Sequence, residues 1–551
     1  MQINRTGGMD SFSTVMIRGA SSSSVDVFIN GVRINPLFLS SCNISILPDE
    51  IFERVEIYRG FTPAKLGFSN TGGSVNIVTG KGKRDFYGLK LSYGSFNTIE
   101  SGLIVSGNEG ESGYLLSLYQ RHTDGDFEFV NHNGTPLNRE DDVIKKRQNN
   151  HRDEYALSLY AASGLSRYLK LNISLVPYFS SGGVAGPENL ETKYASFASL
   201  TNIFSAENHI QMRNLLKEVV IGYSNLYYRA DMNDEKGEMN MLFADITDTS
   251  GMRDTLYMIY EFLLPKNNLV LKLSYSDEDI LRKSRLGKKE MYEGERKEFT
   301  LTAEDNFELL KNRLYVIPSF GVKNVSDRVV FSSGYLMKDE EKFSSEEWLK
   351  NLRAGIVFRI SDELLFKSNW SQFRRYPDMY EIFGDGIYIY PNPELKPERA
   401  KLIDAGFELS VESLIVKFAL FDNYYEDLIS FWQNSQKTIK PENISKAEIY
   451  GTELYLKPFF HRYIISELSY THQEPLNKSD IPSFKNKILP FRYTDSLYMK
   501  YGFTVSGLKI LYEYNYSSQN FFDAANFLPK GGMPKRSIHN ITLSYDFRRL
   551  D

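Results

Sequence analysis

From residue 84 onward, apolar and polar side chains alternate with a period of two in strand-length runs. Successive side chains of a strand point to opposite faces, so this pattern predicts strands with one apolar and one polar face. No convincing helical periodicity interrupts these runs. Alternation alone fits a soluble sandwich as well as a barrel. Examples are 169–175, 269–275, 352–359 and 541–547.

The connectors between these runs distinguish the two architectures. The sequence contains about twenty predicted strands, and long and short connectors follow one another in turn, which is the pattern of an up-and-down membrane barrel. A Greek-key sandwich has no reason to produce it. The short turns include Gly164-Leu165, Pro265-Lys266, Ser361-Asp362 and Ser506-Gly507. The long connectors are 124–148, 181–195, 231–253, 277–292, 324–349, 374–397, 425–444, 473–492 and 518–534.

Composition favours the barrel. Aromatic residues make up 14% of the 551 residues, with 36 Tyr and 37 Phe, while the mean hydropathy is -0.37. No apolar run approaches the ~18 residues of a membrane helix, whereas aromatic girdles are typical of membrane barrels. The net charge of -5 provides no basic face, so no nucleic-acid partner is expected.

Cysteine and histidine usage gives no metal cluster. The single cysteine, Cys42, excludes an intramolecular disulfide, and the seven histidines are scattered without ligand spacing. Residues 1–6 have no basic or apolar signal-peptide region. Because a barrel bound for the outer membrane must be exported, we expect the signal peptide and the first part of the N-terminal domain to be missing from this chain.

Residues 1–83 form a different, glycine-punctuated unit. The apolar run 25–29 meets Asn30-Gly31, a dipeptide preferred in tight hairpins because both positions need positive φ. Pro48 followed by acidic residues predicts a helix start, and two further strands are expected around Val55 to Ile57 and at 75–79. The sequence therefore predicts a small α/β domain at 1–83, followed by an all-β transmembrane barrel at 84–551.

The order of short motifs in this unit resembles the plug domain of TonB-dependent outer-membrane receptors, most closely the vitamin B12 type. Asn30 stands where Asp is usual, and Phe61-Thr62-Pro63 departs from the usual step after the fourth motif. The five motifs are Ile17-Arg18-Gly19, the strand ending in Asn30-Gly31, Ile46-Leu47-Pro48, residues 51–60 with Arg54, Glu56, Arg59 and Gly60, and residues 72–79 with Gly72, Gly73 and Asn76.

Later segments extend the resemblance over nearly the whole chain. It implies a plug inside a barrel of about 22 strands in a Gram-negative outer membrane. Our strand count is two short of that, so we expect a longer functional protein or different closing strands. These segments are Asp124-Gly125-Asp126-Phe127, 133–135, 147–150, 182–187, Arg375-Tyr376-Pro377, 392–398 and 443–454.

The resemblance also implies a plug–barrel latch. In the family a pair of plug arginines faces a pair of barrel carboxylates, and the matching residues here are Arg18, Arg59, Asp404 and Glu453. The apolar neighbours of Asp404 at 403, 405 and 407 would face lipid, which turns Asp404 toward the lumen. The alternative is that these lumen carboxylates are solvated by pore water.

Two further sets of candidates come from the outer connectors. Tyr376, Tyr388, Tyr390 and Trp432 are candidate ligand-binding aromatics, although interfacial anchoring would explain them equally. Asp124, Asp126 and Glu128 supply hard oxygens that calcium prefers, with a solvated charge run as the alternative.

The expected function is energy-coupled import of cobalamin or a ferric siderophore, with the inner-membrane TonB complex, outer-membrane lipid and the small-molecule cargo as partners. We expect a monomer. A passive channel would not need the plug, and a barrel enzyme would need a catalytic constellation that the sequence does not present. No enzymatic activity is therefore expected.

Overall fold

Twenty antiparallel strands form one barrel whose strand order closes on itself, with β28 beside β7. The computed structural model describes the chain except residues 1, 6–12, 37–38, 40, 47–51, 81, 83–84, 136–137, 187–189, 240–244, 288, 332–340, 385–388, 434–438, 462, 522–523, 527–533 and 546–551. The predicted all-β barrel of about twenty strands is confirmed. No helix in the described part of the chain is long and apolar enough to cross a membrane.

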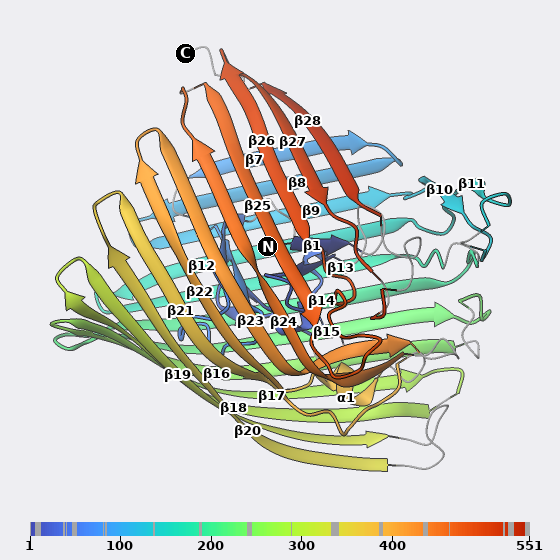
Figure 1. Cartoon of the computed structure of the whole chain (residues 1–551), viewed down its shortest axis with the longest axis horizontal. Coiled ribbons are helices and arrows are strands. Elements are labelled where there is room, and N and C mark those ends of the chain that lie inside the picture. The colour runs from blue at the N-terminus through green and yellow to red at the C-terminus, as the bar shows by residue number, and fades with distance from the viewer. Residues whose placement is uncertain are drawn as a thin grey trace.

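Neighbouring strands in the barrel are neighbours in sequence, except where β9 pairs with β12 and where the order closes from β28 to β7. Long connectors gather at one end, where β10 (Glu128–Asn131) and β11 (Val143–Lys146) form a separate hairpin (Figure 1). The barrel strands are β7 Phe86–Gly94, β8 Thr98–Glu109, β9 Ser112–Thr123, β12 Arg152–Ser166, β13 Leu169–Gly183, β14 Ser196–Gln211, β15 Leu216–Asp234, β16 Asp245–Leu264, β17 Asn267–Ser284, β18 Lys289–Leu310, β19 Leu314–Phe331, β20 Glu341–Arg359, β21 Leu364–Arg375, β22 Glu398–Val411, β23 Leu414–Gln433, β24 Ile439–Pro458, β25 Ile464–Asn477, β26 Asp495–Val505, β27 Leu508–Ser517 and β28 Arg536–Tyr545.

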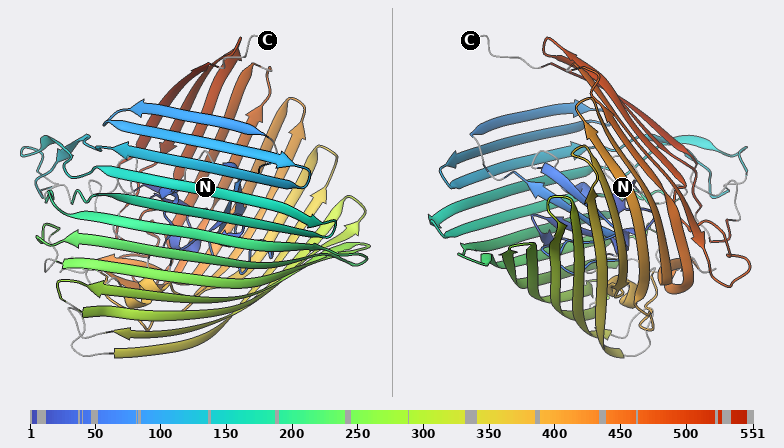
Figure 2. Two further views of the ribbon diagram at one scale, coloured as in Figure 1. Left: turned by 180° about the vertical axis from the view of Figure 1, so that it is seen from behind. Right: turned by 60° about the vertical axis from the view of Figure 1, so that its left-hand side comes forward.

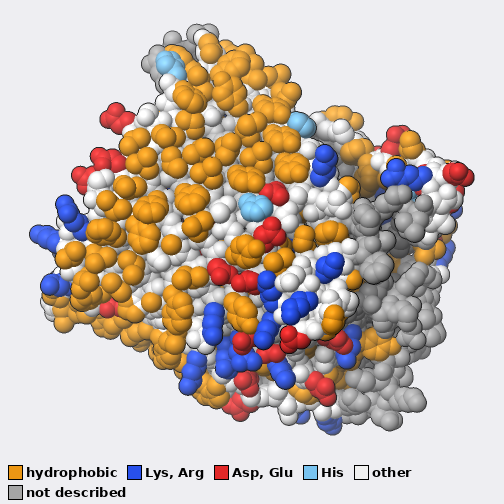
Figure 3. All heavy atoms as spheres, viewed as in Figure 1, with side chains coloured by type: hydrophobic (Ala, Val, Ile, Leu, Met, Phe, Trp, Pro, Cys, Tyr) orange, Lys and Arg blue, Asp and Glu red, His pale blue; other side chains and the backbone are white. Residues whose placement is uncertain are grey.

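The outer surface of the strands is apolar. Hydrophobic side chains cover most of the strand face seen in Figure 3, and charged side chains gather toward the end that carries the long connectors. On β22, Ile403 is 52% exposed and Phe407 is 47% exposed, whereas the side chain of Asp404 between them is only 15% exposed. The period-two pattern therefore separates a lipid-type face from a lumen face.

Several strands extend beyond their predicted ends. β15 and β16 pair as far as Asp234↔Asp245, and β23 and β24 pair as far as Gln433↔Ile439, so the predicted connectors 231–253 and 425–444 are too long. The backbone ladder continues past the predicted ends, and at 425–444 Leu428 and Ile444 of the extension are buried in an apolar cluster. The turn predicted at Gly164-Leu165 lies instead between Ser166 and Leu169.

The expectation of no helix after residue 84 is also wrong. A five-residue helix, α1 (Met379–Phe383), lies in the connector between β21 and β22. Five residues are too few to establish a helical periodicity in sequence. Packing and ion pairs, described below, hold it.

The N-terminal segment forms two small sheets inside the barrel. β1 (Gln2–Arg5) pairs with β2 (Ser13–Met16), and β4 (Val32–Arg33), β3 (Asp26–Ile29), β6 (Gly73–Thr79) and β5 (Phe52–Arg59) form a four-stranded sheet in that order. The predicted hairpin turn is confirmed, with positive φ at Asn30 (49°) and Gly31 (85°). The described part of this segment otherwise contains only the 3₁₀ turns η1 (Ser22–Ser24) and η2 (Ile44–Ile46); the helix start predicted at Pro48 lies outside the described residues.

The plug strands lie inside the barrel, enclosed by its wall, as both views in Figure 2 show. Apolar side chains of β2, β3 and β6 form a core that also includes Val176, Ile203 and Leu226 of the wall strands β13, β14 and β15. Few wall residues join this core. Phe61 and Leu39 of the plug pack on two further apolar wall clusters, and a set of polar contacts between plug and wall forms the candidate site.

Candidate functional site: the plug–barrel interface

A four-residue charge cluster joins the end of β2 to the barrel wall. Arg18 Nη2 lies 2.9 Å from Glu453 Oε2 and Arg18 Nη1 lies 3.2 Å from Asp404 Oδ2. Arg59 Nε lies 3.4 Å from Glu453 Oε1. The structure thus brings together all four residues that the plug motifs and the lumen sidedness single out.

The local backbone places Arg18 against the wall. The chain turns sharply at Arg18 and Gly19, which have positive φ of 48° and 69°. A Cβ at Gly19 would lie 3.1 Å from the Ile449 side chain of β24, so glycine permits the close approach. The Arg18 guanidinium also lies 4.9 Å from the Phe421 ring centre, within cation–π distance.

The charges of the cluster balance, two cations against two carboxylates. Burial alone would lower the pKa of Arg18, but Glu453 and Asp404 outweigh it and raise that pKa above its ordinary value. The arginine therefore stays charged. Asp404 also accepts a hydrogen bond from Asn369 Nδ2 at 3.2 Å, which fixes the carboxylate on β22.

A second set of contacts runs from wall side chains to plug carbonyls. Arg253 on β16 donates to the Asn35 carbonyl at 2.8 Å and binds Glu278 on β17 at 2.7 Å. Lys272, also on β17, donates to the carbonyls of Lys65 and Leu66 at 3.1 and 2.9 Å. Sequence reasoning missed both cations; they are visible only as charged positions on the lumen face of a strand.

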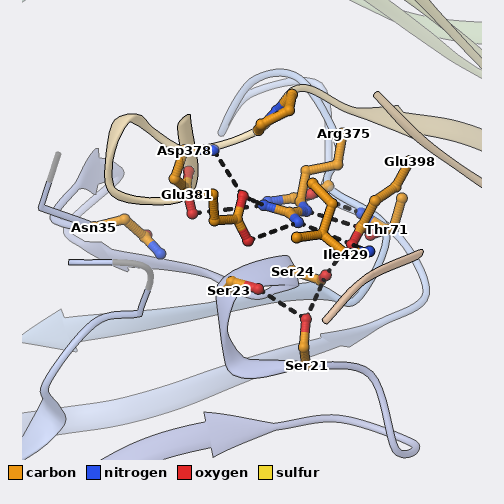
Figure 4. A network of polar contacts seen from close by, with 12 residues as sticks. Ser21, Ser23, Ser24, Asn35, Thr71, Arg375, Asp378, Glu381, Glu398 and Ile429 are labelled. Carbon is orange, nitrogen blue, oxygen red and sulfur yellow. Dashed lines mark hydrogen bonds and ion pairs between the residues drawn. The ribbon is translucent and has the colours of Figure 1, made fainter. Parts of the chain in front are cut away.

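A third cluster, also missed, lies around Arg375 at the outer end of β21 (Figure 4). Its guanidinium binds Glu381 of α1 at 2.8 and 3.0 Å and Glu398 of β22 at 2.8 Å through two nitrogens. All three side chains are at most 2% exposed. Glu398 also accepts hydrogen bonds from the plug hydroxyls of Ser24 (3.4 Å) and Thr71 (3.3 Å). Arg375 and Glu398 lie in segments that extend the family resemblance, but the sequence analysis assigned neither residue a role.

The other plug-motif residues stabilise the plug itself. Asn30 Nδ2 donates to Thr79 Oγ1 and Gly31 N donates to Asn76 Oδ1. Asn76 Nδ2 in turn donates to Glu56, which also pairs with Arg54. Glycine is required at residue 73, where a Cβ would lie 2.3 Å from the Tyr58 carbonyl, and residue 72 is similarly tight; Gly60 adopts positive φ of 69°.

The structure describes the side chains of two of the four candidate ligand aromatics. Tyr376 is packed: its hydroxyl lies 2.6 Å from Ser345 Oγ and its ring lies against Arg296. Tyr390 is partly exposed beside the bridge of Ile389 to Ile439. Tyr388 and the side chain of Trp432 lie outside the described residues.

The calcium candidates are engaged separately. Asp124 contacts His122 at 3.3 Å and Asp126 contacts Lys146 at 3.1 Å, while Glu128 is exposed on β10. Among the described residues, the group with metal-compatible spacing is instead Asp277, Asp279 and Glu295, on β17 and β18.

A cavity of about 1180 Å³ lies between the plug and the wall strands β24 to β28, β8, β9 and β12 to β14. Arg59 and Ile57 line it from the plug, and Arg152, Tyr498 and Arg536 line it from the wall. The helix α1 packs instead against β17, β18 and β19, none of which lines this cavity.

Comparisons with known proteins agree with this architecture. A family model described as TonB dependent receptor-like, beta-barrel matches residues 92–551, and a TonB-dependent Receptor Plug Domain model matches residues 1–74. The chain is 21% identical over 497 residues, 87% of its length, to the vitamin B12 transporter BtuB of Vibrio vulnificus, covering 72% of that protein.

Solved structures show the same fold at low identity. The copper transporter OprC superposes with a TM-score of 0.81 at 11% identity, over 100% of this chain and 86% of that one. The siderophore receptor PiuA from Acinetobacter baumannii gives 0.77 at 13% identity, over 99% and 87%.

Proposed function

Since the chain belongs to the TonB-dependent receptor family, we propose that it imports a scarce, large nutrient across the outer membrane, with energy delivered through TonB. Its relatives are transporters and receptors. Residues 1–83 act as the plug, residues 84–551 as the barrel, and the protein works as a monomer in the Gram-negative outer membrane.

The observation that carries this proposal is the plug that occupies the lumen and is tied to the wall by ion pairs and hydrogen bonds as well as by apolar packing. A passive channel has no use for such an obstruction. Buried ion pairs add little net stability compared with apolar packing, but they hold a specific geometry. We therefore assign Arg18, Arg59, Asp404 and Glu453 the role of a latch that holds the plug until TonB pulls it.

The proposed cargo is cobalamin or a ferric siderophore. Support for cobalamin comes from the B12 transporter that aligns with 87% of this chain, and support for a siderophore comes from the fold shared with PiuA. The cavity beside Arg59 is the space through which such a molecule would enter, and Tyr390 and Tyr388 are candidate contacts on the outer connector. Calcium bound at Asp124, Asp126 and Glu128 would order the β10–β11 connector.

The test is uptake by cells that lack their own B12 and siderophore receptors and express the full-length gene. We expect accumulation of labelled cobalamin or of one ferric siderophore, and loss of that accumulation when TonB is deleted. Uptake that persists without TonB would support a passive channel instead. A strain carrying the empty vector is the background control.

A further inference from the structure

The cavity beside the plug extends along the inside of the wall from the outer rim toward the opposite end of the barrel. At the rim it is lined by Phe96, in the turn between β7 and β8, and by Arg536, the first residue of β28. At the other end it is lined by Tyr455 and Glu467, which lie near the short connector between β24 and β25. A ligand that enters from outside therefore meets the rim residues first.

Two arginines line this cavity while the carboxylates with which they pair lie deeper. Arg152 Nε lies 3.3 Å from Glu154 Oε1, and the arginine side chain is 19% exposed against 3% for the glutamate. Arg59 of the plug repeats this order, since its side chain is 45% exposed and that of Glu453 is 14% exposed. Both arginines line the cavity and neither glutamate does. Each ion pair therefore presents its positive end to a ligand.

Arg536 adds a third positive charge at the rim. Its side chain is exposed, and within the described part of the chain no ion pair joins it to a carboxylate. The carboxylate among the described lining residues is Glu467, at the opposite end of the cavity. Asp124 and Asp126, which follow β9 at the rim, are engaged by His122 and Lys146. The outer part of the cavity is therefore cationic, and such a surface attracts anions.

Aromatic rings lie beside these cations. The Arg152 guanidinium carbon lies 5.0 Å from the ring centre of Phe197, within cation–π distance. Phe96 and Phe127 meet edge to face at the rim, with ring centres 6.2 Å apart, and Phe96 is 42% exposed. All three rings line the cavity. Because aromatic rings pair well with one another in edge-to-face and offset geometries, this lining suits a ligand that carries both negative charge and aromatic groups.

We propose that this cavity binds an anionic metal chelate with aromatic arms, and that Arg152 and Arg536 select this cargo over neutral ones. A ferric tricatecholate has the required chemistry, because three dianionic catecholates outweigh the charge of Fe³⁺ and each carries a ring. A ferric trihydroxamate and cyanocobalamin have no net charge. The inference rests on the proposed function and narrows its candidate cargoes to one chemical class.

The test compares the binding of a ferric tricatecholate, ferric citrate, a ferric trihydroxamate and cyanocobalamin to the full-length protein in detergent micelles. We expect the tricatecholate to bind at least about tenfold more tightly than the two neutral probes, and its affinity to fall as salt is raised, because ions screen charge–charge attraction. Ferric citrate is anionic without rings and should bind more weakly than the tricatecholate. Equal affinity for a neutral probe would overturn the charge selection, and equal affinity for ferric citrate would overturn the aromatic requirement.

Single charge removals locate the site. Arg536→Gln and Arg152→Gln should each weaken tricatecholate binding by about tenfold, the usual effect of losing a hydrogen bond to a charged group, and Arg536→Lys should retain most of the affinity. Because Arg536 is exposed, its replacement leaves the fold intact even if Arg152→Gln does not. Arg399→Gln is the matched control: Arg399 is 50% exposed at the outer end of β22, pairs with Asp427 at 2.7 Å and lies outside the cavity, so this variant should bind like the parent protein.

The outcomes distinguish this proposal from the import proposal. Parent-like affinity in both Arg536→Gln and Arg152→Gln, or an equal loss in Arg399→Gln, would show that the cavity does not select the anion. If cells take up cobalamin or the trihydroxamate with the help of TonB and the protein does not bind the tricatecholate, the anionic class is wrong and the import proposal stands. If the tricatecholate binds as expected but no cargo accumulates in a TonB-dependent way, the import proposal fails and the binding site remains.

Discussion

Replacement of Arg18 by Met should loosen the plug. Met keeps an unbranched apolar side chain of similar reach, so the change removes the charge while preserving volume. Glu453 and Asp404, whose side chains are 14% and 15% exposed, lose their shared cation. Asp404 then keeps the amide of Asn369 at 3.2 Å, and Glu453 keeps the half-exposed Arg59 at 3.4 Å.

The magnitude follows from this geometry. Removing one partner of a buried ion pair typically costs about 3–5 kcal/mol because a charge is left without compensation. Here Arg59 still compensates Glu453 in part, so we expect the lower end, about 3 kcal/mol, which corresponds to roughly a 100-fold rise in the population of displaced plug.

Two assays report this change. Hydrogen exchange of the β2 and β3 amides should accelerate by about 100-fold, and cells should admit a large hydrophilic antibiotic that the parent protein excludes. The compensated variant Arg18→Met with Asp404→Leu and Glu453→Met removes all three charges and should recover most of the protection, since apolar replacement of a whole buried cluster is often neutral. If Arg18→Met matches the parent protein in both assays, or if the compensated variant is looser than the single one, the latch reasoning is wrong.

Three further outcomes test other parts of the structure. Gly31→Ala should destabilise the plug by about 1 kcal/mol, because the turn requires φ of 85°; thermal unfolding measures it. Lys272→Met removes the donor of two plug carbonyls in the 61–71 segment. Each freed carbonyl should lower the local free energy of unfolding by about 1–3 kcal/mol, so amide exchange in that segment should become faster. Burial and then repulsion from Glu381 raise the pKa of Asp378 to about 7, so the folded connector holds a proton that the unfolded chain releases near pH 4. Raising the pH from about 4 to 7 should therefore weaken the α1 connector against protease, and Asp378→Asn should remove this dependence.

The fold could be predicted because a strand with one lipid-type face imposes a period-two pattern. β22 is an example: Ile403 and Phe407 are exposed on its outer face, and Asp404 between them points into the lumen. The same logic explains the errors at 231–253 and 425–444. At 425–444 the strands continue with adjacent buried residues such as Leu428 and Ile429, so the period-two pattern that marks a strand is lost while the backbone ladder goes on.

The site could be predicted only where a motif or a sidedness argument named a side chain. The family resemblance named the four latch residues, and sidedness supported the two wall carboxylates, Asp404 and Glu453. Lys272 and Arg253 bind backbone carbonyls, and a carbonyl acceptor has no sequence signature. For α1, five residues carry no periodicity, and its partners Arg375 and Glu398 meet it only in three dimensions.

The chemistry of the plug–wall interface bears on how a plug can be both secure and movable. Among the described residues, the apolar core built on β2, β3 and β6 takes in Val176, Ile203 and Leu226 of the wall, and Phe61 and Leu39 of the plug pack on two further apolar wall clusters. An extensive apolar interface would contribute about 25 cal/mol for every Å² buried and would resist displacement as a whole. The polar contacts at Arg18, Lys272 and Glu398 are instead separate and short-ranged, so a pulling force can break them one after another while water satisfies each freed group. Successive rupture requires far less force at any moment than detachment of one continuous apolar surface. In the proposed import cycle, these polar contacts are the part of the plug–wall interface that can be broken one at a time.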